Sequence, residues 1–323
     1  MKYPKVSIVM PVYNEQEKIE NCLKSIREQD YPQDKIEIVF VDDDSTDNTL
    51  QIAKEFKIKK IRNGKHDYDI GKSLGIKASS GEYLMFLDAD NVLTEKDWIK
   101  KMITPLLEDP TLVGSQPLWF RYNKKDKFFD RYCTMYGITD PLTIYFNNRS
   151  ALMLWEKKWK NHLIKEERDY FTVEFDKRSL PTIGSVGFTI KKEFVLKTDY
   201  APAFSHLDAM QDLVASGFNK FAMVKLDIIH LHSRSFKDFL FKLERNFGIF
   251  IRDYDKRRYK WDVPFARKIY ATIAMLTFFV PMYHALRGFL KIRDLAWFAH
   301  PFLSFIVIVN YLKIYFLWKI GLK

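Results

Sequence analysis

Cysteine is scarce in this chain of 323 residues, which contains only Cys22 and Cys133. Two cysteines form neither a multi-disulfide framework nor a CxxC metal site. The sequence is therefore not that of a disulfide-stapled scaffold, and its low cysteine content is typical of a protein from a reducing compartment.

Internal repeats and low-complexity tracts are also missing, and the opening residues do not resemble a secretory leader. Residues 2–11 form a short strand-like run followed by polar residues, where a leader has a longer apolar segment and a cleavage site. A chain of this length buries a full core, so we expect one large domain with an appendage.

Acidic residues are sparse in one part of the chain only. Residues 237–323 contain 16 Lys and Arg but only 6 Asp and Glu, a net charge of +10. Residues 1–236 contain 36 Lys and Arg and 35 Asp and Glu, a net charge of +1. The formal net charge of +11 therefore comes almost entirely from the C-terminal segment. The same segment contains two long uncharged runs, at residues 269–286 and 295–312.

Each uncharged run is long enough to span a bilayer, for which roughly 18 residues are needed. Both are rich in aromatic residues and flanked by Lys and Arg, which is typical of interfacial anchoring or of a short transmembrane hairpin. Histidine and proline interrupt both runs, and a pair of buried helices is the alternative. We expect residues 236–323, which begin with an amphipathic basic segment, to associate with a membrane. Long uncharged runs do not suit a groove that follows phosphates, so we expect no nucleic-acid partner.

The rest of the chain begins with an alternation of strand and helix patterns. Strands are predicted at residues 5–12, 36–41, 58–61 and 83–87. Helices are predicted between and after them, at about 15–29, 47–56, 70–79 and 94–107. This alternation predicts an α/β fold, with a mostly parallel, Rossmann-like sheet and flanking helices. Further along the chain, residues 124–136 and 150–163 have helix patterns and residues 223–232 have a strand pattern.

Polar segments follow three of the predicted strands, and ligands bind at such strand ends in parallel sheets. Asp88 and Asp90 are two residues apart, so in an extended backbone they leave the same face. Carboxylates so close repel each other unless a cation lies between them or one is protonated. Hard divalent cations prefer oxygen ligands. The pattern predicts a metal site; the alternative is that Asp90 and Asn91 cap the next helix.

These segments resemble the motifs of the family 2 glycosyltransferases of GT-A fold. The resemblance covers residues 5–120 and rests on IVMPVYNE at 8–15, VDDDSTDNT at 41–49 and GEYLMFLDAD at 81–90. It implies an enzyme that moves a sugar from a nucleotide-diphosphate donor to an acceptor, with Mn²⁺ or Mg²⁺ as cofactor.

The resemblance also assigns roles to single residues of the three segments. The side chains expected at the base, ribose and diphosphate of the donor are those of Pro11, Tyr13, Glu15, Asp42, Asp43 and Asp88. The metal is expected on Asp90, with Asp88 as a further ligand. Lys72, at the start of a predicted helix, is expected to be solvated rather than in contact with a phosphate.

An inverting transfer needs a carboxylate that takes the proton of the acceptor hydroxyl. The resemblance places this base at a helix start about ten residues before a glycine, which here indicates Asp208, with Gly217 downstream. The Glu-Asp pair that is customary in the family is absent. Asp212, one helical turn further on, is therefore the alternative.

His230 and His232 are predicted to share one face at the end of a strand, where relatives often carry a histidine that completes the metal shell. A structural or surface role is the alternative. The Gln-x-x-Arg-Trp motif of processive members is replaced by Lys242-Leu-Glu-Arg245-Asn, which argues against a chain-polymerising synthase.

Together the patterns and the resemblance predict a GT-A catalytic domain at residues 1–235. Its nucleotide-sugar half is expected at 1–120, its acceptor half at 121–235, and the membrane-associating helices at 236–323. The predicted function is metal-dependent, inverting transfer to a hydroxyl of a lipid-linked or envelope-glycan acceptor, at the cytoplasmic face of the cell membrane. The alternatives are a polyprenyl-phosphate sugar synthase of the same fold, a non-catalytic membrane scaffold and a nucleotidyltransferase.

Overall fold

The computed structural model describes residues 3–232 and 235–321, and the chain divides into two compact units. The first unit comprises Met1–Leu118, Trp159–Lys177 and Ile183–His230. The second comprises Trp119–Lys158, Arg178–Thr182 and Leu231–Lys323, so a middle segment of the chain belongs with the C-terminal helices. The functional division at residue 235 stays a prediction.

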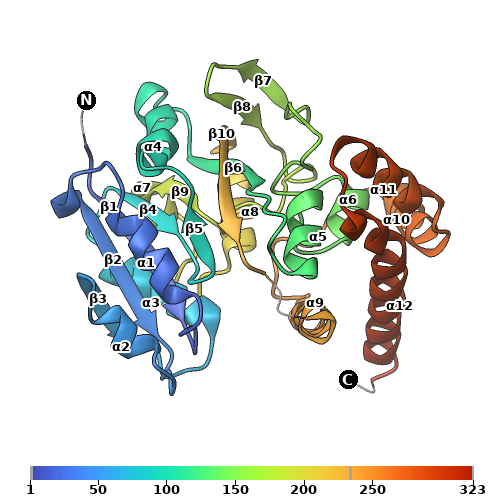
Figure 1. Cartoon of the computed structure of the whole chain (residues 1–323), viewed down its shortest axis with the longest axis horizontal. Helices are drawn as coiled ribbons and strands as arrows, with labels where there is room; N and C mark the ends of the chain where they lie inside the picture. The colour runs from blue at the N-terminus through green and yellow to red at the C-terminus, as the bar shows by residue number, and fades with distance from the viewer. Residues whose placement is uncertain (1–2, 233–234, 322–323) are drawn as a thin grey trace. The chain divides into compact units, whose positions relative to one another are not determined.

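A ten-stranded sheet, in the order β3-β2-β1-β4-β9-β6-β10-β8-β7 with β5 paired to β10, organises the first unit (Figure 1). The first five strands are β1 (Val6–Val12), β2 (Ile36–Asp42), β3 (Ile58–Arg62), β4 (Tyr83–Phe86) and β5 (Asn91–Leu93). The others are β6 (Gly114–Phe120), β7 (Leu163–Glu166), β8 (Tyr170–Glu174), β9 (Phe188–Lys191) and β10 (Lys220–His230).

Helices flank this sheet. Those of the first unit are α1 (Ile19–Arg27), η1 (Gln33–Lys35), α2 (Thr49–Ala53), α3 (Tyr68–Ala78), α4 (Trp98–Glu108), α7 (Lys192–Val195) and α8 (His206–Ala215). Gly75 allows α3 to lie directly on β1, because a Cβ atom at this position would come within 2.5 Å of Val9 Cγ1.

The sheet is mixed. Its β3-β2-β1-β4 portion is parallel as expected, with Val12 paired to Asp42 and Val9 paired to Phe86. The pairings of β9 with β4 and β6, of β10 with β5 and β8, and of β7 with β8 are antiparallel. Because β1, β2 and β4 run in the same direction, the polar segments that follow them emerge at the same edge of the sheet.

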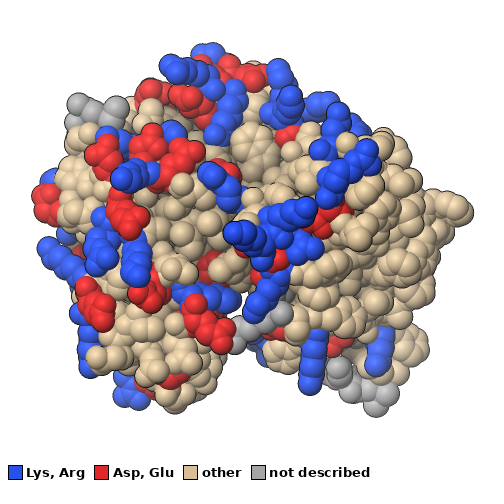
Figure 2. All heavy atoms as spheres, viewed as in Figure 1, with Lys and Arg blue, Asp and Glu red and all other residues tan. Residues whose placement is uncertain are grey.

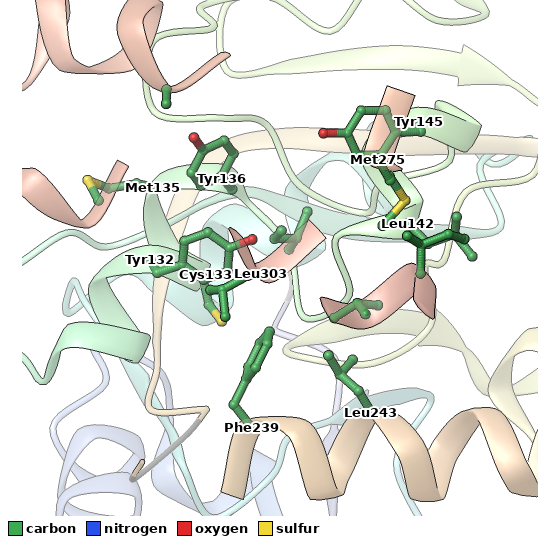
Figure 3. Packing of buried hydrophobic residues seen from close by; sticks show 14 of the residues in the cluster. Tyr132, Cys133, Met135, Tyr136, Leu142, Tyr145, Phe239, Leu243, Met275 and Leu303 are labelled. Carbon is green, nitrogen blue, oxygen red and sulfur yellow. The ribbon is translucent and has the colours of Figure 1, made fainter. Parts of the chain in front are cut away.

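The second unit is helical and has its own core. Its helices are α5 (Phe128–Tyr136), α6 (Leu142–Phe146), α9 (Phe236–Arg252), α10 (Phe265–Leu276), α11 (Phe279–Lys291), η2 (Leu295–Phe298) and α12 (Ala299–Lys319). Figure 3 shows aromatic and aliphatic side chains of α5, α6, α9, α10 and α12 meeting in this core. Within it, the hydroxyls of Tyr132 and Tyr145 each lie 2.9 Å from a different ring nitrogen of His300.

The C-terminal helices expose many large apolar side chains, among them Phe265, Phe279, Leu290, Leu295, Phe302 and Phe316. In Figure 2 the surface over α10, α11 and α12 is mostly uncharged. Residues 295–319 form one helical segment that is long and apolar enough to cross a membrane, with half of its apolar window buried. Together α10 and α11 are as long and apolar, but they are bent by 71° at their break.

Several predicted elements differ from those observed. The pattern predicts a helix at residues 150–163, but residues 150–162 form no regular element and β7 begins at Leu163. Strand β10 ends at His230 rather than at His232. The short elements β5, α6, β7 and β8 are not predicted. They depend on pairing with distant segments, as when β8 pairs with β10, and a local pattern does not report such pairing.

Asp140, in the loop before α6, provides a prediction about stability. It accepts hydrogen bonds from Tyr311 Oη at 2.7 Å and from Leu142 N at 2.9 Å, and its burial raises its pKa from 3.8 to about 6. Because the folded state binds the proton more tightly, the buried charge costs stability above pH 6, on the order of 3 kcal/mol, and the cost declines as pH falls toward 4.

We therefore expect Asp140→Asn to unfold at a higher temperature than the wild type at pH 7.5, with the difference shrinking toward pH 4. Thermal melts across this range measure it. Asp255→Asn, at an exposed position, is the control and should shift nothing. An Asp140→Asn protein that melts below the wild type at pH 7.5 would contradict this prediction.

Candidate active site

The segments that follow β1 and β2 are tied together by hydrogen bonds. Asp43 N donates to the carbonyl oxygen of Val12 at 2.9 Å, and Asn14 N donates to Ser45 Oγ at 3.1 Å. Glu15 N donates to Thr49 Oγ1 at 2.8 Å. The loop that starts at Pro11 and the acidic segment that starts at Asp42 therefore form one wall, as their strand-end positions predict.

The acidic residues of this wall have different surroundings. Asp42 is 3% exposed, accepts a hydrogen bond from Ser45 N at 3.2 Å, and lies 3.8 Å from Lys60 Nζ. Asp43 accepts a hydrogen bond from His66 N at 2.9 Å. The His66 ring lies edge-on to Tyr13, with 6.0 Å between the centroids, and Tyr13 is 52% exposed. Tyr13 and His66 thus offer aromatic surface beside an acceptor, which suits a nucleoside.

Asp88 and Asp90 follow β4, the strand beside β1. Tyr68 Oη donates to Asp88 Oδ1 at 2.5 Å, and Asn91 Nδ2 donates to Asp90 Oδ1 at 3.0 Å. Burial and the neighbouring charge of Asp90 raise the pKa of Asp88. The positive charges of Lys72 and His230 act in the opposite direction but do not outweigh these two effects.

Asp90 is the point at which three segments of the first unit meet. Lys18 Nζ lies 3.7 Å from Asp90 Oδ2 and 3.8 Å from Glu15 Oε2, which links Asp90 to the wall after β1. His230 Nε2, at the end of β10, lies 3.8 Å from Asp90 Oδ1. His230 is thus near the carboxylate pair, whereas His232 lies beyond the strand, in the second unit.

The donor set around Asp90 fits a divalent cation whose shell is completed by a ligand. Within residues 3–232 and 235–321, no three His, Cys, Asp or Glu side chains gather as a metal-holding group. Mg²⁺ sites of nucleotide enzymes typically use one or two carboxylates, with phosphate oxygens and water in the other positions. Asp88 and Asp90 are two carboxylates of this kind, and His230 lies 3.8 Å from Asp90.

Lys72 corrects the expectation of a solvated lysine. It is 1% exposed; its Nζ lies 3.3 Å from His206 Nδ1 and 4.1 Å from the centroid of the Tyr68 ring. Burial lowers its pKa, against the opposing effects of Asp69 and Asp88. Its charge in turn lowers the pKa of Asp88. The glycines in the GKSLG motif, which permit close packing of α3, are the signal in the sequence that could have indicated a buried position.

The predicted base lies on α8, which begins one residue after its N-cap, Ser205. Asp208 is in the first turn and is 7% exposed, and Asp212 is one turn further and half-buried. His206, at the start of the same helix, contacts Lys72 of α3. The structure therefore connects the start of α8 to the surroundings of Asp88, while the catalytic roles of Asp208 and Asp212 stay predictions.

A sequence model of the family described as glycosyl transferase family 2 matches residues 7–165. Those residues form a glycosyl transferase family 2 domain. All three motifs and the carboxylate pair lie inside the matched range.

Two curated relatives of this family 2 domain are glycosyltransferases. The chain is 34% identical over 109 residues to glycosyltransferase AglE of Haloferax volcanii, an alignment that covers 32% of this chain and 36% of that protein. It is 32% identical over 120 residues to the dolichyl N-acetyl-alpha-D-glucosaminyl phosphate 3-beta-D-2,3-diacetamido-2,3-dideoxy-beta-D-glucuronosyltransferase of Methanococcus voltae, over 34% of this chain and 37% of that protein. The chain thus spans about a third of the length of these relatives.

The fold extends beyond the matched family 2 domain. The structure of mannosyltransferase PcManGT from Pyrobaculum calidifontis, in complex with GDP-Man and Mn²⁺, superposes over 99% of this chain and 88% of that chain, with a TM-score of 0.55 and 16% identity. This likeness shows the GT-A-like α/β fold, with its central sheet and flanking helices.

Proposed function

We propose that the protein is an inverting glycosyltransferase that moves a sugar from a nucleotide-diphosphate donor to a hydroxyl of a lipid-linked or envelope-glycan acceptor. One observation carries this proposal: the three segments that carry the family motifs converge in the first unit, with Asp90 within 4 Å of Lys18 and His230. The GDP-Man and Mn²⁺ of the Pyrobaculum complex support the donor class and the metal. The dolichyl-linked substrate in the name of the Methanococcus relative supports a lipid-linked acceptor.

In this mechanism the wall after β1 and β2 binds the nucleoside, with Tyr13 against the base and Asp42 and Asp43 as hydrogen-bond acceptors. Asp90 and Asp88 would hold Mn²⁺ or Mg²⁺, with His230 as a further ligand. The cation would supply Lewis-acid stabilisation of the leaving diphosphate.

The acceptor hydroxyl attacks the anomeric carbon in line with the departing nucleoside diphosphate, which inverts the configuration. Asp208 takes the hydroxyl proton as the new bond forms, and Asp212 is the alternative base. Burial of Asp208 in the first turn of α8 holds its side chain in place.

A screen of donors tests the proposed function. With Mn²⁺ present, we expect one or two of the common nucleotide-sugars to be hydrolysed slowly without an acceptor, releasing a nucleoside diphosphate. Release of inorganic diphosphate from a nucleoside triphosphate and a sugar 1-phosphate would instead support a nucleotidyltransferase. Absence of metal-dependent turnover and of binding heat with every donor would contradict the proposal and favour a non-catalytic scaffold.

We also propose that the exposed apolar faces of α10, α11 and α12 lie in the cytoplasmic leaflet of the cell membrane. The net charge of +10 over residues 237–323 supports this, because each basic residue near an anionic leaflet adds about 1 kcal/mol of attraction. Phe279 is 80% exposed and Phe302 is 60% exposed, which is costly in water and favourable in lipid.

We expect the full chain to float with liposomes that contain phosphatidylglycerol. Phe279→Glu and Phe302→Glu should each weaken this binding about tenfold or more, since burial of a Phe side chain contributes about 1.5–3 kcal/mol. Ile164→Glu, at a 52% exposed position on β7 in the first unit, is the control and should bind like the wild type. Recovery of the wild type entirely in the lipid-free fraction would contradict the membrane proposal.

A further inference from the structure

A groove of about 600 Å³ runs between α9 and α12 in the second unit. Its volume lies within the range of ~300–1,000 Å³ that is typical of small-molecule sites. Neither the family motifs nor the proposed chemistry of the first unit uses this groove.

The groove is lined by one face of each helix. On α9 the lining positions are 241, 244, 245, 248, 249, 251 and 252, and on α12 they are 310, 313, 314, 317 and 318. Most of these positions follow the three-and-four spacing of a single helix face. The two helices touch beside these faces, where the rings of Phe247 and Tyr311 stack with 4.0 Å between centroids.

The lining combines apolar and charged side chains. Phe241, Ile314, Leu317 and Trp318 provide apolar surface, and the exposed fractions of Phe241 and Trp318 are 61% and 37%. The charged lining residues are three cations and one carboxylate, namely Arg245, Arg252, Lys313 and Glu244. The charged lining residues therefore have a net positive charge, and they lie beside exposed apolar side chains.

Gly248 opens the groove on the α9 side. A Cβ atom at this position would meet no heavy atom within 4 Å, so the glycine faces open space rather than a tight contact. A glycine inside a helix costs about 1 kcal/mol relative to alanine. Here that cost leaves room along the groove that any side chain would fill.

We infer that this groove binds one anionic membrane lipid, with its phosphate at Arg245 and Lys313 and a hydrocarbon chain along Phe241, Ile314 and Leu317. Arg252, also in the lining, already forms an ion pair with Asp253. Charge complementarity favours an anionic headgroup over a zwitterionic one. The source of the lipid is the leaflet, because the side of α12 away from the groove also exposes apolar side chains, with Leu312 and Phe316 44% and 60% exposed. Only the statement that the lipid comes from the leaflet rests on the proposed membrane association; binding of the lipid in the groove does not.

A soluble lipid tests the groove without a membrane. Dihexanoyl-phosphatidylglycerol, titrated into the full chain below its micelle concentration in a calorimeter, should bind with one-to-one stoichiometry. Dihexanoyl-phosphatidylcholine should bind about tenfold more weakly. Lys313→Gln and Arg245→Gln should each weaken phosphatidylglycerol binding about fivefold, the equivalent of about 1 kcal/mol, and weaken phosphatidylcholine binding by a smaller factor.

Gly248→Trp fills the groove and should weaken binding of both lipids tenfold or more. Lys237→Trp adds the same side chain at an exposed position of α9 outside the groove, and it should bind like the wild type. Equal thermal unfolding midpoints for the two tryptophan variants show that both are folded.

Unchanged binding in Gly248→Trp would overturn the inference, as would equal affinity for the two headgroups. Displacement of phosphatidylglycerol by an equal concentration of inorganic phosphate would also overturn it, because the site would then recognise an anion alone. Lipid binding by a protein that does not float with liposomes would contradict the membrane proposal and leave the groove supported. The titration does not depend on donor turnover, so failure of the proposed transferase activity is seen separately.

Discussion

Asp90→Asn is expected to lower kcat/KM for sugar transfer a hundredfold or more. The substitution keeps the shape of the side chain and removes the negative charge that lies nearest to Lys18 and His230. Loss of a metal ligand removes charge stabilisation of the departing diphosphate, which typically contributes several kcal/mol. Steady-state rates at saturating Mn²⁺, with the donor found in the screen, measure the effect.

A measurement of Mn²⁺ binding distinguishes loss of the metal ligand from misfolding of the Asp90→Asn protein. Calorimetric titration of Mn²⁺ with a nucleoside diphosphate present should give a heat in the wild type that is lost, or shifted to much higher Mn²⁺ concentration, in Asp90→Asn. Asp30→Asn is the matched control, because the Asp30 side chain is 71% exposed and pairs only with surface Lys100 in the described contacts. An Asp90→Asn protein with the wild-type rate and the wild-type Mn²⁺ titration would remove the basis of the proposed metal site.

The second large effect is expected from Asp208→Asn. If Asp208 is the base, kcat should fall about 10²–10⁴-fold, while KM for the donor changes little, because the proton transfer occurs only in the transition state. Asp212→Asn, one turn further along α8, should keep most of the activity. Initial rates with a hydroxyl acceptor and the chosen donor measure both variants side by side.

The pattern of the two variants distinguishes the rival mechanisms. If Asp212→Asn loses activity and Asp208→Asn does not, Asp212 is the base. Full activity of Asp208→Asn toward a polyprenyl phosphate would favour the phosphate-accepting synthase, since a phosphate acceptor needs no deprotonation. Full activity of both variants toward a hydroxyl acceptor would contradict a carboxylate base on α8.

The part of the fold that carries the motifs could be predicted from the sequence because its order is local. Strands β1, β2 and β4 each end in a polar segment, and parallel strands place such ends at one edge of the sheet. The proximity of the early loop, Asp42 and Asp90 follows from that rule. The expected sugar transfer came from the resemblance to family 2 glycosyltransferases, and the family model that matches residues 7–165 agrees with that resemblance.

The remainder depends on contacts between distant segments, which no local pattern encodes. The burial of Lys72 depends on His206, 134 residues away, and the place of His230 beside Asp90 depends on the length of β10. Residues 150–162 have a helical pattern of apolar residues, yet their apolar side chains pack within irregular structure, as for the buried Met153 in the core of the second unit. Tertiary packing overrides periodicity in that segment.

The clamp of two tyrosine hydroxyls on the His300 ring has a consequence for how α12 meets its surroundings. This helix is apolar on nearly all sides, so hydrophobicity alone does not select which side turns inward. If α12 rotated about its axis or slipped by one turn, the ring nitrogens of His300 would lose their hydrogen bonds to Tyr132 and Tyr145. Loss of hydrogen bonds by buried polar atoms destabilises the folded state. The buried His300 thus dictates which outer side chains α12 presents, including those that we propose to contact lipid.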